Sequence, residues 1–220
     1  MIKKSVRVSP DNTIFEIKAS QKLSGCPLAI SIGSGKVLYV LLNSNHIVAI
    51  DADSMTILKD IEPKDFEGTA LSFASATNEV WVGDKKGLIH ILDGADLSQK
   101  ALIEKKHNHT VTVMTSSKDG KLVASGDSYR YIYVFNTETK EEVGCFAYHI
   151  AKIIGLDFNS SGTSLLTACL DRSVGIANLA DKTNRVVPKP NEKELTAAVF
   201  NDEDGFYTAG NDCSIRLWRK

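Results

Sequence analysis

Hydrophobic and polar residues alternate along most of this chain in short runs, a pattern typical of β-strands. Near the end, Ile215 and Leu217 alternate with polar residues behind the turn-forming pair Asn211-Asp212, and Trp218 follows. A period of two residues indicates a strand with one buried face. Similar runs are predicted at residues 111–115, 121–125, 131–135 and 142–146, and again at 153–158, 164–168, 174–178 and 184–187. The sequence therefore predicts an all-β protein.

Glycine-containing turns recur between these runs at a nearly constant interval. Gly120, Gly162 and Gly205 are 42 and 43 residues apart, and Gly35 precedes Gly120 by 85 residues, about two intervals. The missing glycine turn falls near residues 77–78, where one apolar run follows another. A period of about 40–45 residues with four short strands is typical of a β-propeller blade, whereas helical repeats have shorter periods.

The period divides a single domain, residues 1–220, into five blade-like units. Their approximate ranges are 23–62, 66–104, 107–146, 149–188 and 191–220. The fifth unit lacks an outer strand, and residues 1–22 add two strand-like runs, 5–9 and 13–18, before the first unit. Because an uncovered strand edge favours aggregation, we expect residues 4–9 to pair with the strand that contains Trp218.

The fourth unit has an order of residues that resembles the WD repeat. In that repeat a His, a Ser or Thr, an Asp and a Trp form a buried tetrad that holds the blade. Buried polar groups are stable only when all of them are hydrogen-bonded, and a complete network makes a turn rigid. The fourth unit offers His149, Thr167 and Asp171, with Ala177 at the tryptophan position.

The fifth unit also follows the WD pattern in part. It has Thr208, Asp212 and Trp218 at the matching positions, with Asn191 where the histidine is expected. The last two units are therefore the ones in which we expect the tetrad to stabilise a blade.

The earlier units depart further from the WD pattern. The third unit keeps His107 and Ser125, but Phe135 replaces the tryptophan and Tyr129 stands where the aspartate is expected. The first and second units lack the tetrad almost entirely. We expect apolar packing to hold these three blades.

A longer stretch resembles the C-terminal end of the actin-interacting protein 1 family. It reads AYHIAKIIGLDFNSSGTSLLTACLDRSVGIANL and is followed by NRVVPKP and the last unit. The segments LSGCPLAISIGSGKVLYVLL and HNHTVTVMTSSKDGKLVASGD are similar to the units before that end. The resemblance implies part of the second of two seven-bladed propellers. It also implies actin and cofilin as partners and a role in cofilin-dependent disassembly of actin filaments.

Two ring geometries follow from five units. An incomplete ring leaves an open edge, whereas a smaller ring of five blades would be closed by the N-terminal strands. We favour the incomplete ring, part of a seven-bladed propeller, because the taper of the side chains sets the number of blades.

Composition argues against several classes of partner. The chain has 220 residues, 43% of them hydrophobic, and a formal net charge of −1. This balance gives no general attraction to nucleic acid or to a membrane surface, and apolar runs such as 37–42 are far shorter than the roughly 20 residues of a membrane span.

The four cysteines are too far apart for a zinc motif or a small disulfide framework; they are Cys26, Cys145, Cys169 and Cys213. Without a signal-peptide pattern we expect a cytoplasmic protein, and the resemblance implies that it acts at the cytoskeleton.

Motifs for catalysis or cofactor binding are weak in this sequence. Residues 33–36, GSGK, resemble a phosphate-binding loop, but Val37 and a strand follow where Ser or Thr and a helix are needed. A hairpin turn is therefore the better interpretation. Residues 107–109, HNH, lack a third metal ligand nearby, and Asp171 and Asp212 are interpreted as repeated turns. We expect no enzymatic activity, metal, cofactor or small-molecule substrate.

One group of loop residues is a candidate binding surface. Its members are Lys85, Lys86, Lys105, Lys106, Tyr129 and Arg130. They lie in the turn between the middle strands of the second unit, in the loop that enters the third unit and in the equivalent turn of the third unit. These three segments open on one rim of a propeller, so the residues are expected to form a contiguous basic surface with an aromatic member. Arg and Tyr are frequent interface anchors. The alternative is a solvated charged rim, because Lys is depleted in interface cores.

Three functions are compatible with this pattern to different degrees. The resemblance favours an interaction protein of the actin cytoskeleton. A generic WD-repeat scaffold for another cytosolic complex is the alternative. A propeller enzyme would need polar side chains that converge in the central channel, and the sequence gives no indication of them.

Overall fold

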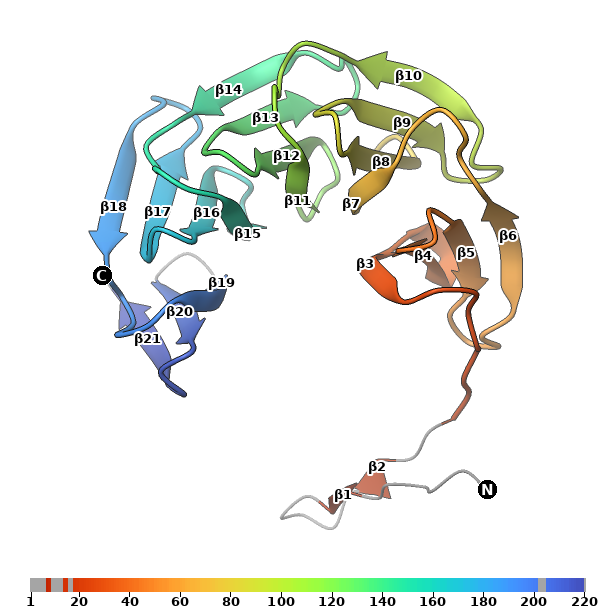
Figure 1. Cartoon of the computed structure of the whole chain (residues 1–220), viewed down its shortest axis with the longest axis horizontal. Helices are drawn as coiled ribbons and strands as arrows, with labels where there is room; N and C mark the ends of the chain where they lie inside the picture. The colour runs from red at the N-terminus through yellow and green to blue at the C-terminus, as the bar shows by residue number, and fades with distance from the viewer. Residues whose placement is uncertain (1–6, 9–13, 16–17, 202–204, 220) are drawn as a thin grey trace.

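The chain forms an arc of five antiparallel β-sheets, which we call blades 1 to 5 in chain order (Figure 1). The computed structural model describes residues 7–8, 14–15, 18–201 and 205–219. Within each blade the strands follow one another in sequence order, with the first strand nearest the centre of the arc and the last on its outside. The predicted all-β propeller architecture is confirmed.

The strand bounds repeat regularly along the chain. Blade 1 consists of β3 (Pro27–Ile32), β4 (Val37–Leu42), β5 (Ile47–Asp51) and β6 (Ile57–Ile61). Blade 2 consists of β7 (Gly68–Ala74), β8 (Glu79–Asp84), β9 (Ile89–Asp93) and β10 (Gln99–Ile103). Blade 3 consists of β11 (Val111–Ser116), β12 (Leu122–Asp127), β13 (Ile132–Asn136) and β14 (Glu142–Phe146). Blade 4 consists of β15 (Ile153–Phe158), β16 (Ser164–Cys169), β17 (Ser173–Asn178) and β18 (Asn184–Pro188). Blade 5 consists of β19 (Leu195–Asn201), β20 (Gly205–Gly210) and β21 (Ile215–Arg219).

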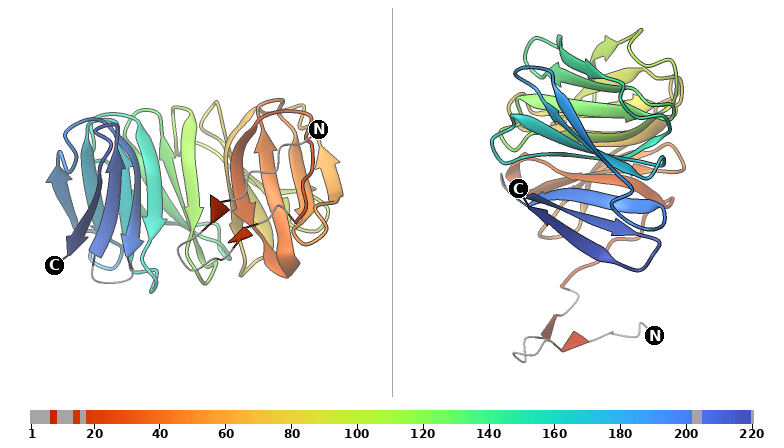
Figure 2. Two further views of the ribbon diagram at one scale, coloured as in Figure 1. Left: turned by 90° about the horizontal axis from the view of Figure 1, so that it is seen from below. Right: turned by 90° about the vertical axis from the view of Figure 1, so that its left-hand side faces the viewer.

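The strands run between two rims of the arc (Figure 2). Because neighbouring strands are antiparallel, the turn after the second strand and the loop after the fourth strand of each blade open on one rim, which we call rim A. The remaining turns open on the opposite rim, which we call rim B. One helical turn lies on rim B, η1 (Ser34–Lys36), and no helix among the described residues is long and apolar enough to cross a membrane.

Most of the hydrophobic core lies between neighbouring blades. One cluster joins Leu41 of blade 1 to Val82 of blade 2, and the next joins Trp81 of blade 2 to Phe135 of blade 3. Middle strands such as β8 are buried on both faces, so they read as continuous apolar runs. Full burial of one such Leu or Phe side chain stabilises the fold by about 1.5–3 kcal/mol.

Polar side chains also join the inner strands of adjacent blades. Thr69 on β7 donates its hydroxyl to the carbonyl of Val111 in blade 3 at 2.6 Å, and Thr112 donates to the carbonyl of Ile153 in blade 4 at 2.6 Å. Such bonds satisfy groups that would otherwise be buried without partners. The blades are therefore held in one register around the arc.

The two ends of the arc expose apolar faces instead of meeting. In blade 1 the exposed residues alternate along β3, and Ile32 is 76% exposed. In blade 5 they lie on β19 and β21, where Ile215 is 77% exposed. The five blades form an incomplete ring, so the alternative of a closed five-bladed ring is wrong for this structure (Figure 1).

Blade 5 has three strands, and the outer edge of β21 has no partner strand among the described residues. A hollow of about 650 Å³ lies between blades 4 and 5, and Phe200, Phe206 and Trp218 contribute to its lining. The expected pairing of residues 4–9 with this edge is wrong for the described part of that segment. There β1 (Arg7–Val8) pairs instead with β2 (Ile14–Phe15), and the rest of the segment lies outside the described residues.

The motif that resembles a phosphate-binding loop forms the turn between β3 and β4. The Gly33 N–H donates to the Val37 carbonyl at 2.6 Å, and Gly35 has a φ of 64°. This left-handed conformation favours glycine. Lys36 is paired with Asp53 at 2.7 Å. The motif is therefore a hairpin turn.

Candidate interaction surface

A buried hydrogen-bonded chain links the strands of blade 4. His149 Nε2 lies 2.7 Å from Thr167 Oγ1, and the Tyr148 hydroxyl lies 3.0 Å from the same oxygen. On the other side of the imidazole ring, His149 Nδ1 lies 2.9 Å from Ser173 Oγ and 3.3 Å from Asp171 Oδ2. The three residues expected from the WD pattern therefore meet, and a tyrosine hydroxyl joins them.

Tyr148 takes the place of the absent tryptophan. Ala177 is fully buried in the cluster against which Tyr148 packs. A Cβ atom added to Gly175 would lie only 2.1 Å from the Tyr148 ring. The small residues on β17 therefore leave room for a ring that enters from the preceding loop. Sequence alignment with the WD repeat missed this replacement because Tyr148 is far in sequence from the tryptophan position.

Three groups of blade 4 that could ligate a metal are hydrogen-bonded to protein groups. Ligand atoms of His149, Cys169 and Asp171 lie within 4.8 Å of one another. Burial raises the pKa of the Cys169 thiol to about 11, and its Sγ lies 3.2 Å from the Ala151 carbonyl oxygen. Burial also lowers the pKa of His149, which keeps the ring neutral, and both ring nitrogens are hydrogen-bonded. The potential ligands are thus already engaged with protein groups.

In blade 5 the tetrad is divided into two halves. The Trp218 indole donates to Thr208 Oγ1 at 3.1 Å. Separately, the Asn191 amide donates to Asp212 Oδ1 at 3.1 Å and to Ser214 Oγ at 3.0 Å. The hydrogen bond from Ser214 is the main cause of the lowered pKa of Asp212. The asparagine does not connect Asp212 to Thr208, and among the described residues its own Oδ1 has no hydrogen-bond partner.

Blade 3 contains a polar network with its aspartate at an unexpected position. His107 Nε2 lies 2.7 Å from Ser125 Oγ, and His107 Nδ1 lies 3.0 Å from Asp127 Oδ2. All three side chains are buried. Tyr129 occupies the expected aspartate position, and the prediction that this blade has no aspartate in its network is wrong. Asp127 fulfils the role from two residues earlier in the chain.

Blade 2 contains a related pair, although the sequence analysis found almost no tetrad there. Asp84 Oδ2 lies 3.1 Å from His90 Nε2, and the Phe66 ring stacks on His90 with 3.6 Å between ring centroids. Asp84 also accepts hydrogen bonds from the Lys86 and Leu88 N–H groups at 2.8 Å. The signal that could have revealed both blades is the Gly-Asp pair, which ends β8 and β12 alike.

Three loops of rim A lie against one another where blades 2 and 3 meet. Thr110 Oγ1 donates to the Lys85 carbonyl at 2.9 Å, and the Thr110 carbonyl accepts from the Ser128 N–H at 2.8 Å. These bonds connect the β8–β9 turn, the β10–β11 loop and the β12–β13 turn. The structure thus brings together the loops that contain Lys85, Lys86, Lys105, Lys106, Tyr129 and Arg130, which we call the rim A patch.

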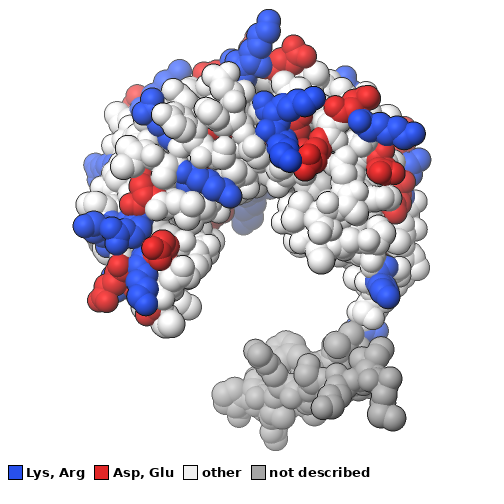
Figure 3. Space-filling view, in the orientation of Figure 1, with Lys and Arg blue, Asp and Glu red and all other residues white. Residues whose placement is uncertain are grey.

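The basic residues of the rim A patch differ in how far their charges are neutralised. Lys85 pairs with Glu67 at 3.3 Å, and Lys106 pairs with Glu142 at 2.6 Å. Within the described part of the chain, no carboxylate pairs with the other three cations, which are Lys86, Lys105 and Arg130. Figure 3 shows Lys and Arg side chains gathered with some acidic ones where these blades meet.

The β12–β13 turn presents an aromatic and basic tip. Tyr129 is 50% exposed, and the Arg130 guanidinium carbon lies 5.4 Å from the Tyr129 ring centroid and 5.3 Å from that of Tyr131. The ring of His109, from the adjacent loop, lies 5.0 Å from that of Tyr129. Cation–π contacts of this kind hold a guanidinium in place.

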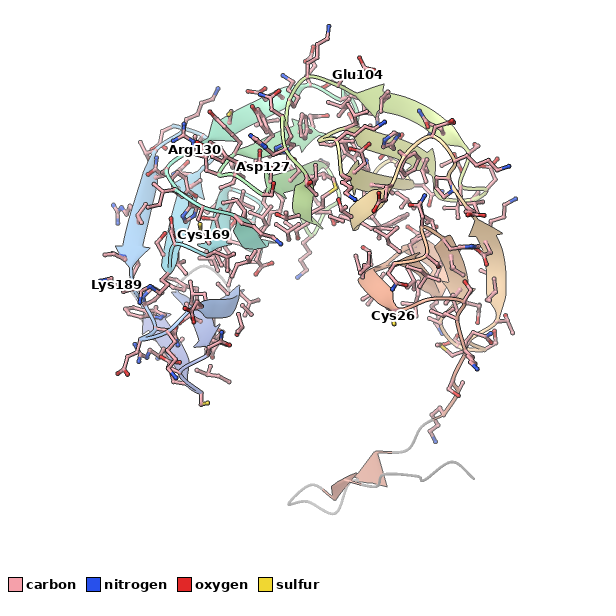
Figure 4. All side chains as sticks on the ribbon, viewed as in Figure 1. Cys26, Glu104, Asp127, Arg130, Cys169 and Lys189 are labelled. Carbon is pink, nitrogen blue, oxygen red and sulfur yellow. The ribbon has the colours of Figure 1, made fainter. Side chains whose placement is uncertain are left out.

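Asp127 fixes this tip from below. Its Oδ1 accepts the N–H groups of Tyr129, Arg130 and Tyr131 at 3.0, 2.8 and 2.9 Å. Burial alone would raise the pKa of Asp127, but the bonds from His107 and these N–H groups outweigh it and lower the pKa. Figure 4 shows Asp127 and Arg130 near each other in blade 3. The buried network and the exposed tip are therefore one structure.

Comparison with known proteins supports a WD-repeat fold. No protein-family model matches the chain. The 66 kDa stress protein of Physarum polycephalum is 27% identical over 218 residues, which are 97% of this chain and 36% of that protein. WD repeat-containing protein 1 of Xenopus tropicalis is 23% identical over 217 residues, which are 93% of this chain and 34% of that protein. An uncharacterized WD repeat-containing protein of Schizosaccharomyces pombe is 26% identical over 133 residues, or 59% of this chain and 22% of that protein.

The chain thus spans about a third of the length of the 66 kDa stress protein and of WD repeat-containing protein 1. Relatives that are WD repeat-containing proteins, together with the radial sheets, identify the fold as a portion of a WD-repeat β-propeller.

Proposed function

We propose that this chain is an interaction module of the cytoplasmic actin cytoskeleton that promotes cofilin-dependent disassembly of actin filaments. The observation that carries the proposal is the ordered resemblance of most of the chain to the actin-interacting protein 1 family. WD repeat-containing protein 1, a relative at 23% identity, is a member of that family. The WD-repeat relatives more generally support a protein-interaction scaffold.

The mechanism is noncovalent. A rigid surface that binds one conformation of actin or cofilin better than another shifts the equilibrium between filament states by that difference in affinity. The buried His and Asp groups of blades 3 and 4 hydrogen-bond to one another within their blades. This arrangement supports a structural role for these groups and a binding role for the loops on rim A.

Co-sedimentation with cofilin-decorated actin filaments tests the proposal. The assay uses the full-length protein that contains this sequence. The protein should pellet with decorated filaments and accelerate their disassembly. Reversing the charges of Lys86, Lys105 and Arg130 to glutamate should weaken both effects. Lys118 and Lys121, on the β11–β12 turn of rim B, are exposed and form the matched control, which should leave both effects intact. Absence of pelleting and of faster disassembly would refute the proposal.

A generic WD-repeat scaffold for a different cytosolic complex is the second candidate. The observation that favours it is the resemblance to the 66 kDa stress protein, which is the most extensive match reported above. Affinity purification from cell extract that recovers a stable assembly without actin or cofilin would support this alternative.

A further inference from the structure

We infer that the tip of the β12–β13 turn, together with the adjoining loops that carry Lys86 and Lys105, is a docking site for an acidic segment of a partner protein. The inference rests on the proposed function as an interaction module and adds the chemistry of the partner. Arg130 is the central anchor, and Tyr129 and Tyr131 hold its guanidinium.

The tip is preorganised for binding. Three consecutive N–H groups are bound by one carboxylate oxygen of Asp127, and His107 binds the other oxygen. The turn therefore loses little conformational freedom when a partner binds, and low ordering cost increases affinity. An exposed loop without such a network would pay this cost at each binding event.

The cations at the site are not neutralised by carboxylates of the described residues. The guanidinium of Arg130 contacts two aromatic rings, and one of its nitrogens donates to the Tyr131 hydroxyl at 3.4 Å. In the described residues no carboxylate meets this guanidinium or the ammonium groups of Lys86 and Lys105. A guanidinium binds a carboxylate with two parallel hydrogen bonds, and neighbouring lysines add charge without a fixed geometry.

Two features of the site favour a protein over a nucleic acid as the partner. Bases bind single-strand sites by stacking on free aromatic rings, but Arg130 lies over both Tyr129 and Tyr131. Glu67 and Glu142 also lie beside the site, paired with lysines, and would repel a continuous phosphate backbone. Separated carboxylates on an extended protein segment can avoid these two acids.

Fluorescence anisotropy with three labelled probes of equal length tests the inference. The probes are an octamer of glutamate, an octamer of glutamine and an eight-nucleotide single-stranded RNA. The glutamate peptide should bind best, and its affinity should fall with added salt because the contacts are exposed. Arg130→Gln should weaken binding at least tenfold, whereas Arg130→Lys, which keeps the charge but loses the planar fork, should give an intermediate loss.

The controls separate this site from folding and from general attraction to lysines. The Arg130 side chain is half-buried against Tyr129 and Tyr131, so Arg130→Gln should lower the thermal unfolding midpoint by no more than about 2–4 °C and leave the protein folded at the assay temperature. Reversing Lys118 and Lys121 on rim B should leave peptide affinity unchanged. If Arg130→Gln binds the glutamate peptide as well as the parent does, or if the RNA binds more tightly than the peptide, the inference is wrong.

The outcomes also distinguish this inference from the proposed function. Peptide binding that depends on Arg130, in a protein that does not pellet with cofilin-decorated filaments, would support the acidic-segment site and refute the actin role. Filament binding that persists while Arg130→Gln leaves peptide binding unchanged would support the actin role and refute the site.

Discussion

Replacing Thr167 by valine keeps the shape of the side chain and removes the hydroxyl group at the centre of the blade 4 network. Thr167 is fully buried, and its oxygen meets both His149 and Tyr148. Because burial lowers the pKa of His149, the ring is neutral. Its Nδ1–H donates toward Ser173 and Asp171, so Nε2 accepts the Thr167 proton, and Thr167 in turn accepts from Tyr148.

The size of the effect follows from counting the groups left without partners. Thr167→Val leaves the Tyr148 hydroxyl and the His149 Nε2 unpaired, and a buried unpaired group costs about 1–3 kcal/mol. We expect a loss of about 2–4 kcal/mol in the free energy of unfolding. Tyr148→Phe leaves the bond between Thr167 and His149 intact, so we expect a loss of about 1 kcal/mol.

The double variant gives the sharper test. Once Tyr148 is phenylalanine, Thr167→Val no longer leaves a tyrosine hydroxyl unpaired, so the combined loss should be smaller than the sum by about 1 kcal/mol. Urea unfolding followed by circular dichroism measures all four proteins, and equal m-values would show comparable transitions. Thr139→Val, at an exposed turn, is the control and should change stability by less than about 0.5 kcal/mol. Strict additivity would contradict the proposed chain of hydrogen bonds.

Two further substitutions follow from single polar groups. Asn191→His should raise the urea midpoint, because an imidazole can bridge Thr208 and Asp212 as His149 bridges its partners in blade 4; a lower midpoint would contradict this reasoning. Asp157→Asn should raise the thermal unfolding midpoint at pH 7 while an amide oxygen still accepts from the Phe200 N–H, at 2.7 Å in the parent. Burial raises the pKa of Asp157, so its carboxylate reduces stability as the pH rises from its unfolded pKa through the higher folded one. The gain should therefore shrink on acidification below that folded pKa, and a gain independent of pH would refute this cause.

The period of the sequence predicted the blades because each blade repeats the same strand and turn lengths. Glycines at rim B turns mark that period even where the polar residues have changed. Gly120 and Gly162 both have φ near 70°, a left-handed conformation that favours glycine over other residues. Turn geometry thus leaves a stronger trace in the sequence than the tetrad does.

The polar networks could be predicted only in part, because a hydrogen-bond partner can come from any residue that lies close in space and not only from a fixed sequence position. The hydroxyl of Tyr148, in the loop before blade 4, takes the place of a tryptophan that the WD repeat has on a different strand. The spacing of the repeat does not point to this tyrosine. The predicted pairing of the N-terminal segment is wrong over its described residues, 7–8, for a related reason. Arg7–Val8 pairs with Ile14–Phe15, which closes a short loop, whereas pairing with β21 would close almost the whole chain at a greater entropic cost.

The position of the aspartate decides which part of rim A becomes rigid. In blades 4 and 5 the aspartate lies later in the turn, and its second oxygen accepts an N–H from the preceding loop, at Ile150 and at Glu192. In blades 2 and 3 it lies two residues earlier, and one oxygen binds the N–H groups of its own turn. In blades 4 and 5 the other oxygen accepts one N–H of its own turn, from Ser173 and from Ser214. The shift therefore replaces the bond to the loop with additional bonds to the N–H groups of the tip. The blades that lost the WD aspartate position are the ones whose turns display Lys86 and Arg130 in fixed positions, as a binding surface requires.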